Sequence, residues 1–62
     1  MSDSLFDVGY SVGFDIGLNG DADSPLNQEI IEKYRGIRGF EQGLMSGMRE
    51  GEKKRLQNQK EE

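Results

Sequence analysis

The chain has 62 residues with a formal net charge of −4 at pH 7, and hydrophobic and charged residues make up 32% each. It contains neither cysteine nor histidine, which excludes disulfides, thiol chemistry and zinc sites of the usual Cys/His type. A chain of this length forms at most one domain with a thin core, so oligomerisation is a natural way for it to bury more apolar surface.

Residues 1–4 are a short polar lead-in, and residues 5–18 are predicted to form the first helix. Glycine recurs there at every fourth position, and each glycine is followed by a large apolar residue. Residues four apart lie one above the other on an α-helix, so a row of glycines leaves a bare groove along one side. The row consists of Gly9, Gly13 and Gly17, followed by Tyr10, Phe14 and Leu18.

The segment 19–25 is rich in turn-forming residues and interrupts this periodicity. Gly20 suits the left-handed end of a helix. Ser24 and Pro25 suit the N-cap and the first turn of a new helix. We therefore expect the chain to reverse direction here and to continue as a second helix.

Residues 26–52 are predicted to form that second helix, and they contain a second glycine row. Each glycine inside a helix costs about 1 kcal/mol relative to alanine. Close packing of other backbone segments along the two grooves is expected to offset this loss. The predicted packing residues are Gly9, Gly13, Gly17, Gly36, Gly39, Gly43 and Gly47, with Phe14, Phe40, Leu44 and Met48 beside them.

The lengths of the two predicted helices differ. At 1.5 Å per residue the first spans about 21 Å and the second about 40 Å. In an antiparallel hairpin the far half of the second helix, with Gly43 and Gly47, therefore has no partner in the same chain. The sequence predicts an all-α, two-helix antiparallel hairpin packed through its glycine rows, and a helical homodimer that covers the remaining row.

Residues 53–62 are mostly charged and polar and are predicted to fray into a C-terminal tail. Small residues at four-residue spacing also occur in membrane helices, but Asp7, Arg38, Arg49 and other charges interrupt every window long enough to span a bilayer. The N-terminus lacks the basic and apolar regions of a signal peptide. We therefore expect a cytoplasmic protein.

The sequence offers little for catalysis. No histidine is present to activate the serine hydroxyls, and no Gly-rich loop ends in Gly-Lys-Ser/Thr. Asp21 and Asp23 could act as an acid–base pair only in a desolvated cleft, whereas a turn is usually in water. We predict that the protein is not an enzyme and uses no metal or cofactor.

Charge is distributed unevenly along the chain. Residues 1–29 include acidic residues but no lysine or arginine. Such a surface repels nucleic acid and favours a basic protein partner, although solubility alone also explains a row of aspartates. The candidate partner-binding residues are Asp3, Asp7, Asp15, Asp21 and Asp23.

The basic residues of the second half provide an alternative surface, for RNA. Several fall on one strip of the predicted second helix, and the strip continues into the tail. Pairing with nearby glutamates is the competing interpretation, since nucleic-acid-binding domains usually have a net positive charge. The candidate RNA-binding residues are Arg35, Arg38, Arg49, Lys53, Lys54 and Arg55.

The segments G-F-D-I-G-L-N-G and G-F-E-Q-G, with Pro25 between them, resemble the ribosome modulation factor family of small bacterial and phage helical hairpins. The resemblance covers Gly13 to Gly43. The resemblance implies a two-helix hairpin. Because some members of the family bind ribosomes, it also implies contact with RNA. This chain differs from those members in its acidic charge and in its lack of tryptophan.

These observations lead to one main hypothesis and two alternatives. The main hypothesis is a small acidic regulator or inhibitor, of the kind that phages encode, which occupies a basic, nucleic-acid-handling surface of a host protein. The first alternative is a ribosome-associated factor that contacts RNA through the second helix. The second is a structural assembly subunit.

Overall fold

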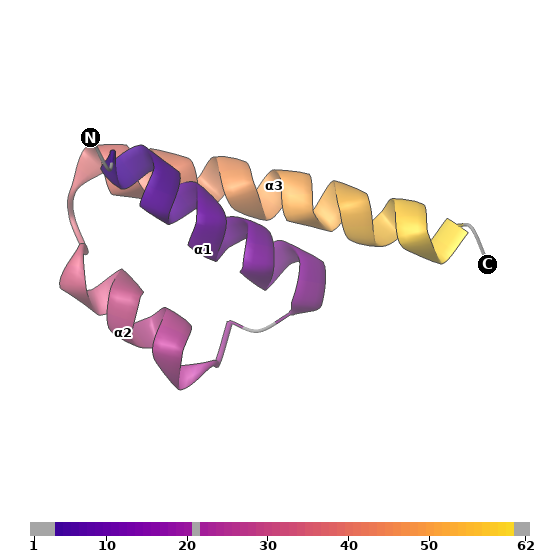
Figure 1. Ribbon diagram of the computed structural model, residues 1–62, viewed down its shortest axis with the longest axis horizontal. Helices are drawn as coiled ribbons and strands as arrows, with labels where there is room; N and C mark the ends of the chain where they lie inside the picture. The colour runs from indigo at the N-terminus through magenta and orange to yellow at the C-terminus, as the bar shows by residue number, and fades with distance from the viewer. Residues whose placement is uncertain (1–3, 21, 61–62) are drawn as a thin grey trace.

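The computed structural model describes residues 4–20 and 22–60. Within these ranges the chain forms three helices and no strand: α1 (Leu5–Asn19), α2 (Pro25–Lys33) and α3 (Arg38–Lys60) (Figure 1). The predicted all-α class is confirmed. The predicted two-helix hairpin is wrong, because the region expected to form one long second helix is divided into α2 and α3.

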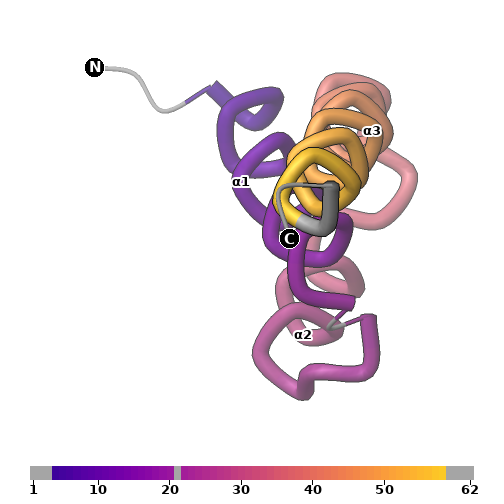
Figure 2. The backbone as a smooth tube through the Cα atoms, turned by 90° about the vertical axis from the view of Figure 1, so that its right-hand side faces the viewer, coloured from indigo at the N-terminus to yellow at the C-terminus, as the bar shows by residue number. Residues whose placement is uncertain are grey.

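Helices α1 and α3 lie side by side and run in the same direction (Figures 1 and 2). The order of their contacts shows this, because Gly9 lies against the backbone of Phe40 and Leu44, and Gly17 lies against that of Met48 and Glu52. Helix α2 leads the chain back from the end of α1 to the start of α3. The two long helices are therefore parallel rather than antiparallel.

The break between α2 and α3 has a local cause at Gly36. This residue has a φ of 85°, which is the left-handed region that side chains disfavour. The Ile37 N–H donates to the Tyr34 carbonyl at 3.2 Å, closing a tight turn that needs a positive φ at its third residue. The Glu41 carboxylate accepts the Gly36 N–H at 3.0 Å. These bonds hold the turn and prevent one continuous helix.

The turn between α1 and α2 follows the sequence prediction closely. Helix α1 ends at Gly20, which has a φ of 72° and donates its N–H to the Ile16 carbonyl at 2.7 Å. A glycine in this conformation is a common end of helices. Ser24 occupies the N-cap position of α2 with an extended backbone, and Pro25 begins the helix, although Ser24 makes no side-chain capping bond.

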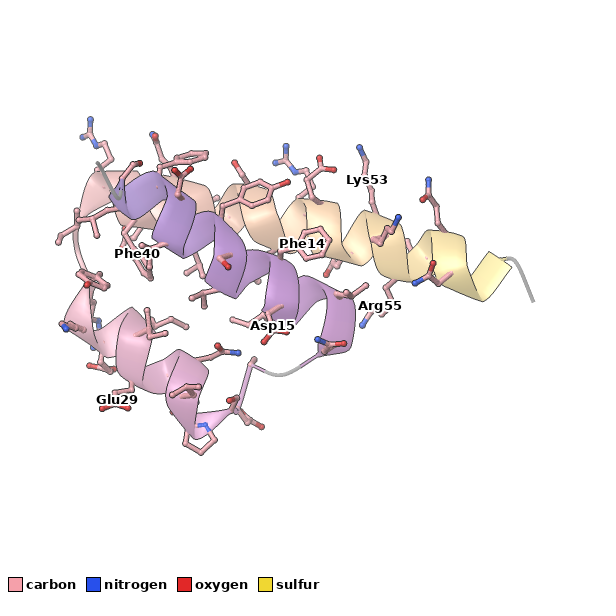
Figure 3. All side chains as sticks on the ribbon, viewed as in Figure 1. Phe14, Asp15, Glu29, Phe40, Lys53 and Arg55 are labelled. Carbon is pink, nitrogen blue, oxygen red and sulfur yellow. The ribbon has the colours of Figure 1, made fainter. Side chains whose placement is uncertain are left out.

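The apolar core lies along the contact of α1 with α3. Phe40 is only 1% exposed, and Val12 and Ile16 of α1 are also buried. The Tyr34 ring, from the turn before α3, packs 5.4 Å from the Phe40 ring. Figure 3 shows Phe40 near the start of α3, on the side where α2 lies. Helix α2 covers this side loosely, since Asn27 is its one buried residue among those described.

Helix α3 is longer than α1 and continues past its end (Figure 1). Residues 52–58 are exposed. The sequence predicts a frayed tail from residue 53, whereas the helix extends to Lys60. No helix in the described part of the chain has the length and hydrophobicity required to cross a bilayer.

Candidate binding surface

The two glycine rows pack against each other inside one chain. A Cβ atom on Gly9, Gly13 or Gly17 would collide with the backbone of α3, and one on Gly43, Gly47 or Gly51 would collide with the backbone of α1. Because each row receives the backbone of the opposite helix, no side chain separates the two helices along this line. We call this contact the glycine interface.

The remaining predicted packing residues divide into two groups. A Cβ atom on Gly36 or Gly39 would meet no packed neighbour within 4 Å beyond the adjacent backbone, so the prediction that these glycines pack is wrong. Phe40 is buried, Phe14 and Leu44 are partly buried, and Met48 is 36% exposed. The glycine interface therefore begins at Gly43 on α3, one helical turn later than the sequence suggests.

The glycine interface determines which residues of α3 face away from α1. On an α-helix, positions about half a turn round from Gly43 and Gly47 point away from α1. The residues at these positions are all exposed. We call them the outer face of α3: Arg38, Glu41, Gln42, Met45, Arg49, Glu52, Lys53 and Leu56.

Three of the six predicted RNA-binding residues belong to this outer face: Arg38, Arg49 and Lys53. Lys54 and Arg55 lie on other sides of the helix, beyond the end of α1, and Figure 3 shows Lys53 and Arg55 pointing in opposite directions. Arg35 lies in the turn before α3 and pairs with Glu32 at 3.3 Å. The predicted basic strip is therefore shorter than the sequence suggests.

The outer face also contains two apolar side chains that sequence reasoning missed. Met45 is 65% exposed and Leu56 is 57% exposed. The spacing of positions 38, 42, 45, 49, 53 and 56 follows one side of a helix and could have revealed the combination. The face thus joins these hydrophobic groups with side chains of both charges, since the exposed Glu41 and Glu52 lie on it as well.

Few ion pairs neutralise the cations of the outer face. The Lys53 Nζ lies 3.8 Å from a Glu50 carboxylate oxygen, and both side chains are exposed. Exposed ion pairs of this kind contribute little stability. Arg38 and Arg49 have no ion pair among the described residues. The nearby Glu41 is engaged with the Gly36 N–H.

The predicted acidic surface is less coherent. Asp7 and Asp23 are exposed. Asp15 is partly buried and faces α2 (Figure 3), where its carboxylate accepts bonds from Asn19 at 2.7 Å and Asn27 at 3.2 Å. Asp15 therefore helps to dock α2. Asp3 and Asp21 lie outside the described residues.

A row of aromatic rings follows the edge of α1. The Phe6, Tyr10 and Phe14 rings stack in sequence, with centroids 6.3 Å apart in each pair. Phe6 is 40% exposed and the other two are partly buried. The rings flank the glycine interface, so their role in packing is sufficient to explain the row.

No group of three or more acidic side chains in the described ranges is arranged to hold a metal ion. The proposed acid–base pair of Asp21 with Asp23 cannot be placed, since Asp21 lies outside those ranges. What the described residues offer is therefore a set of surfaces and packing contacts.

Comparison with known proteins gives no match to a family model, a curated protein or a solved structure. The resemblance to the ribosome modulation factor family thus stays a prediction.

Proposed function

We propose that this protein is a small non-catalytic regulator that binds a macromolecular partner through the outer face of α3. The observation that supports the proposal is the joint exposure of cations and apolar side chains along one helix. Methionine and arginine are both enriched in protein interfaces relative to the rest of the surface.

The rest of the fold suits this role. Binding costs less when the contact surface is already ordered, and the glycine interface holds α3 against α1 by direct backbone contact. Past the end of α1, the helix has exposed residues, so a partner can reach it from several sides. Regulation or inhibition would follow if the partner needs the occupied surface for its own activity.

An acidic surface that binds a basic, nucleic-acid-handling protein is a second candidate. It is supported by the exposed Asp7, Asp23 and Glu29 and by the absence of lysine and arginine from residues 1–32. A phage-type inhibitor would use such a surface. It ranks lower because Asp15 is engaged by two asparagine side chains.

RNA binding is a third candidate, through Arg38, Arg49 and Lys53 with help from Lys54 and Arg55. The exposure of these side chains favours it. Contacts to phosphates would make the affinity fall steeply with salt. This candidate does not use the exposed Met45 and Leu56.

A homodimer and a larger structural assembly are further proposals, but the glycine rows no longer favour them. The sequence suggests a homodimer because one glycine row has no partner in an antiparallel hairpin. In the parallel arrangement each row is covered by the other helix. Association of copies would therefore need a different contact surface.

Affinity purification from the native host tests these candidates. We would compare the natural chain with an α3 variant, Arg38→Glu/Arg49→Glu/Lys53→Glu, and with a matched acidic-surface variant, Asp7→Lys/Asp23→Lys/Glu29→Lys. Loss of the partner with the α3 variant alone supports our proposal. Loss with the acidic-surface variant alone supports the second candidate, and recovery of salt-sensitive ribosomal RNA supports the third. Retention of the same partner by both variants contradicts the use of either surface.

A further inference from the structure

We infer that Asn19 is a deamidation site that the last turn of α1 protects, and that its conversion loosens this turn. An asparagine directly before a glycine occurs once in the sequence, at Asn19 and Gly20. The inference is independent of the proposed function, because it concerns the end of α1 and the docking of α2 rather than the outer face of α3. It follows from the chemistry of this pair, its exposure and the two hydrogen bonds that hold it.

Deamidation of asparagine is a reaction of the side chain with the following backbone nitrogen. The Gly20 nitrogen gives up its proton to solvent and forms a bond to the side-chain carbonyl carbon of Asn19. The bond from this carbon to the Asn19 amide nitrogen breaks, and the nitrogen takes up a proton and leaves as ammonia. Water then adds to either carbonyl of the succinimide ring, whose carbon–nitrogen bond breaks as the nitrogen regains a proton. The product is aspartate or isoaspartate.

The pair of Asn19 with Gly20 is suited to this reaction. Glycine has no Cβ, so no side chain hinders the approach of the Gly20 nitrogen. A Cβ on Gly20 would meet no packed neighbour within 4 Å, which leaves room for the ring. Both residues are exposed, so water can reach it. The other asparagines, Asn27 and Asn58, each precede glutamine, whose side chain hinders ring closure.

The folded end of α1 holds both reacting groups away from this path. The Gly20 N–H donates to the Ile16 carbonyl at 2.7 Å, and the Asn19 side-chain amide donates to the Asp15 carboxylate at 2.7 Å. Ring closure requires the Asn19 backbone to leave its helical conformation, which breaks both bonds. Helix ends fray and open locally. The deamidation rate should therefore follow the fraction of molecules in which this turn is open.

The product is expected to weaken the turn that protected Asn19. A carboxylate replaces the donor amide, so the bond to Asp15 becomes a repulsion between like charges four residues apart. A negative charge at the C-terminal end of a helix also opposes the helix dipole. Asp15 accepts a bond from Asn27 of α2 as well, so the change should loosen the docking of α2. Because ammonia is lost to solvent, the conversion proceeds in one direction.

Incubation of the full chain at neutral pH, followed by digestion and mass spectrometry, tests the site. Deamidation changes the mass of the affected peptide, so one digest gives the rates at Asn19, Asn27 and Asn58. In denaturing guanidinium chloride, Asn19 should react faster than the other two. In the folded chain its rate should fall by at least about tenfold. Equal rates at Asn19 in the two conditions, or no excess over Asn27 and Asn58 in the denaturant, would overturn the inference.

Two variants separate the local bond from the docking of α2. Asp15→Ala removes the acceptor of the Asn19 amide and should accelerate deamidation in the folded chain about twofold to fivefold. Asn27→Ala is the matched control, because it weakens the docking of α2 and leaves the bond between Asn19 and Asp15 in place. It should accelerate deamidation less. An equal effect of the two variants would show that the bond to Asp15 does not protect Asn19.

Hydrogen exchange at the Gly20 amide measures the opening of the turn directly. Across the variants, the deamidation rate should rise in proportion to this exchange rate. Low concentrations of guanidinium chloride open the natural chain without a substitution, and they provide the same comparison if Asp15→Ala fails to fold. Deamidation that does not follow the exchange of Gly20 would contradict protection by the turn.

Asn19→Asp reproduces the aspartate product and tests its effect. The Gly20 amide and the amides of α2 should exchange at least about threefold faster than in the natural chain. Asn58→Asp is the matched control, since it adds the same charge at an exposed position near the end of α3, and it should leave these amides unchanged. Equal exchange in Asn19→Asp and the natural chain would show that deamidation does not loosen the turn.

Discussion

Gly13 of α1 packs directly against the main-chain carbonyl of Leu44 in α3. A Cβ at this position would overlap the carbonyl oxygen and would also lie 2.9 Å from the Met48 nitrogen. These atoms belong to the backbone of α3, so they cannot move aside as the end of a flexible side chain could. Gly13 is the central member of its row and has neighbours of the same kind on both sides.

Substitution of Gly13 by alanine should therefore destabilise the protein. Alanine gains about 1 kcal/mol in helix propensity, but separating two packed backbones costs more, and we expect a net loss of about 2–4 kcal/mol in the free energy of unfolding. Urea denaturation followed by circular dichroism measures the change.

Gly39→Ala is the matched control, because Gly39 is also in a helix and has open space where the alanine methyl group would lie. This variant should be neutral or more stable by up to about 1 kcal/mol. Equal effects of the two substitutions would show that the glycine interface does not determine stability.

Gly36→Ala tests the turn that divides α2 from α3. The positive φ of Gly36 costs an alanine about 1–2 kcal/mol, although space is available for the methyl group. We expect the stability to fall by this amount. Gly36→Asn should lose less, since asparagine tolerates the left-handed region better. A gain in helix content in Gly36→Ala would instead indicate that the turn had been replaced by helix.

Phe40→Ala should be among the most damaging substitutions. Phe40 is the largest fully buried side chain among the described residues, and removal of such a ring costs about 3–5 kcal/mol. This loss approaches the whole stability of a small domain. Phe40→Leu, which retains much of the volume, should lose less than about 2 kcal/mol. Thermal unfolding measures the stability of both variants. Equal losses for alanine and leucine would contradict the prediction.

The glycine periodicity was sufficient to predict helices, but it could not determine their direction. A row of glycines accepts another backbone equally well in either orientation, and the parallel arrangement depends on the turn at Gly36. That glycine stands three residues before Gly39, so its position is compatible with membership of the row. Its φ of 85° belongs to the folded turn. Nothing in the sequence distinguishes Gly36 from the glycines of the row.

The candidate surface was predictable in part. Positions of Arg38, Arg49 and Lys53 on one side of a helix follow from their spacing, because that region is helical as expected. The outward direction of this side could not be deduced, since it depends on which row meets α1. The engagement of Asp15 with Asn27 likewise depends on the return of α2 alongside α1.

Asn27→Ala tests the docking of α2 on α1. Asn27 is buried and donates to the Asp15 carboxylate at 3.2 Å, and loss of a buried polar contact costs about 1–3 kcal/mol. We expect hydrogen exchange to accelerate in α2 more than in α3. Asn19→Ala is the control, because its 2.7 Å bond to Asp15 is exposed and its loss should cost less than about 1 kcal/mol. Similar exchange in both variants would contradict a specific role for Asn27.

The stability of the glycine interface should not depend on protein concentration. Both rows come from one chain, so unfolding breaks the interface without separating copies. Melting curves recorded over about a hundredfold range of dilution should therefore give the same Tm. Sedimentation velocity at the same concentrations reports whether copies associate. If the Tm fell with dilution while a dimer dissociated, a second copy would contribute to the packing of the rows, and the intramolecular account would be wrong.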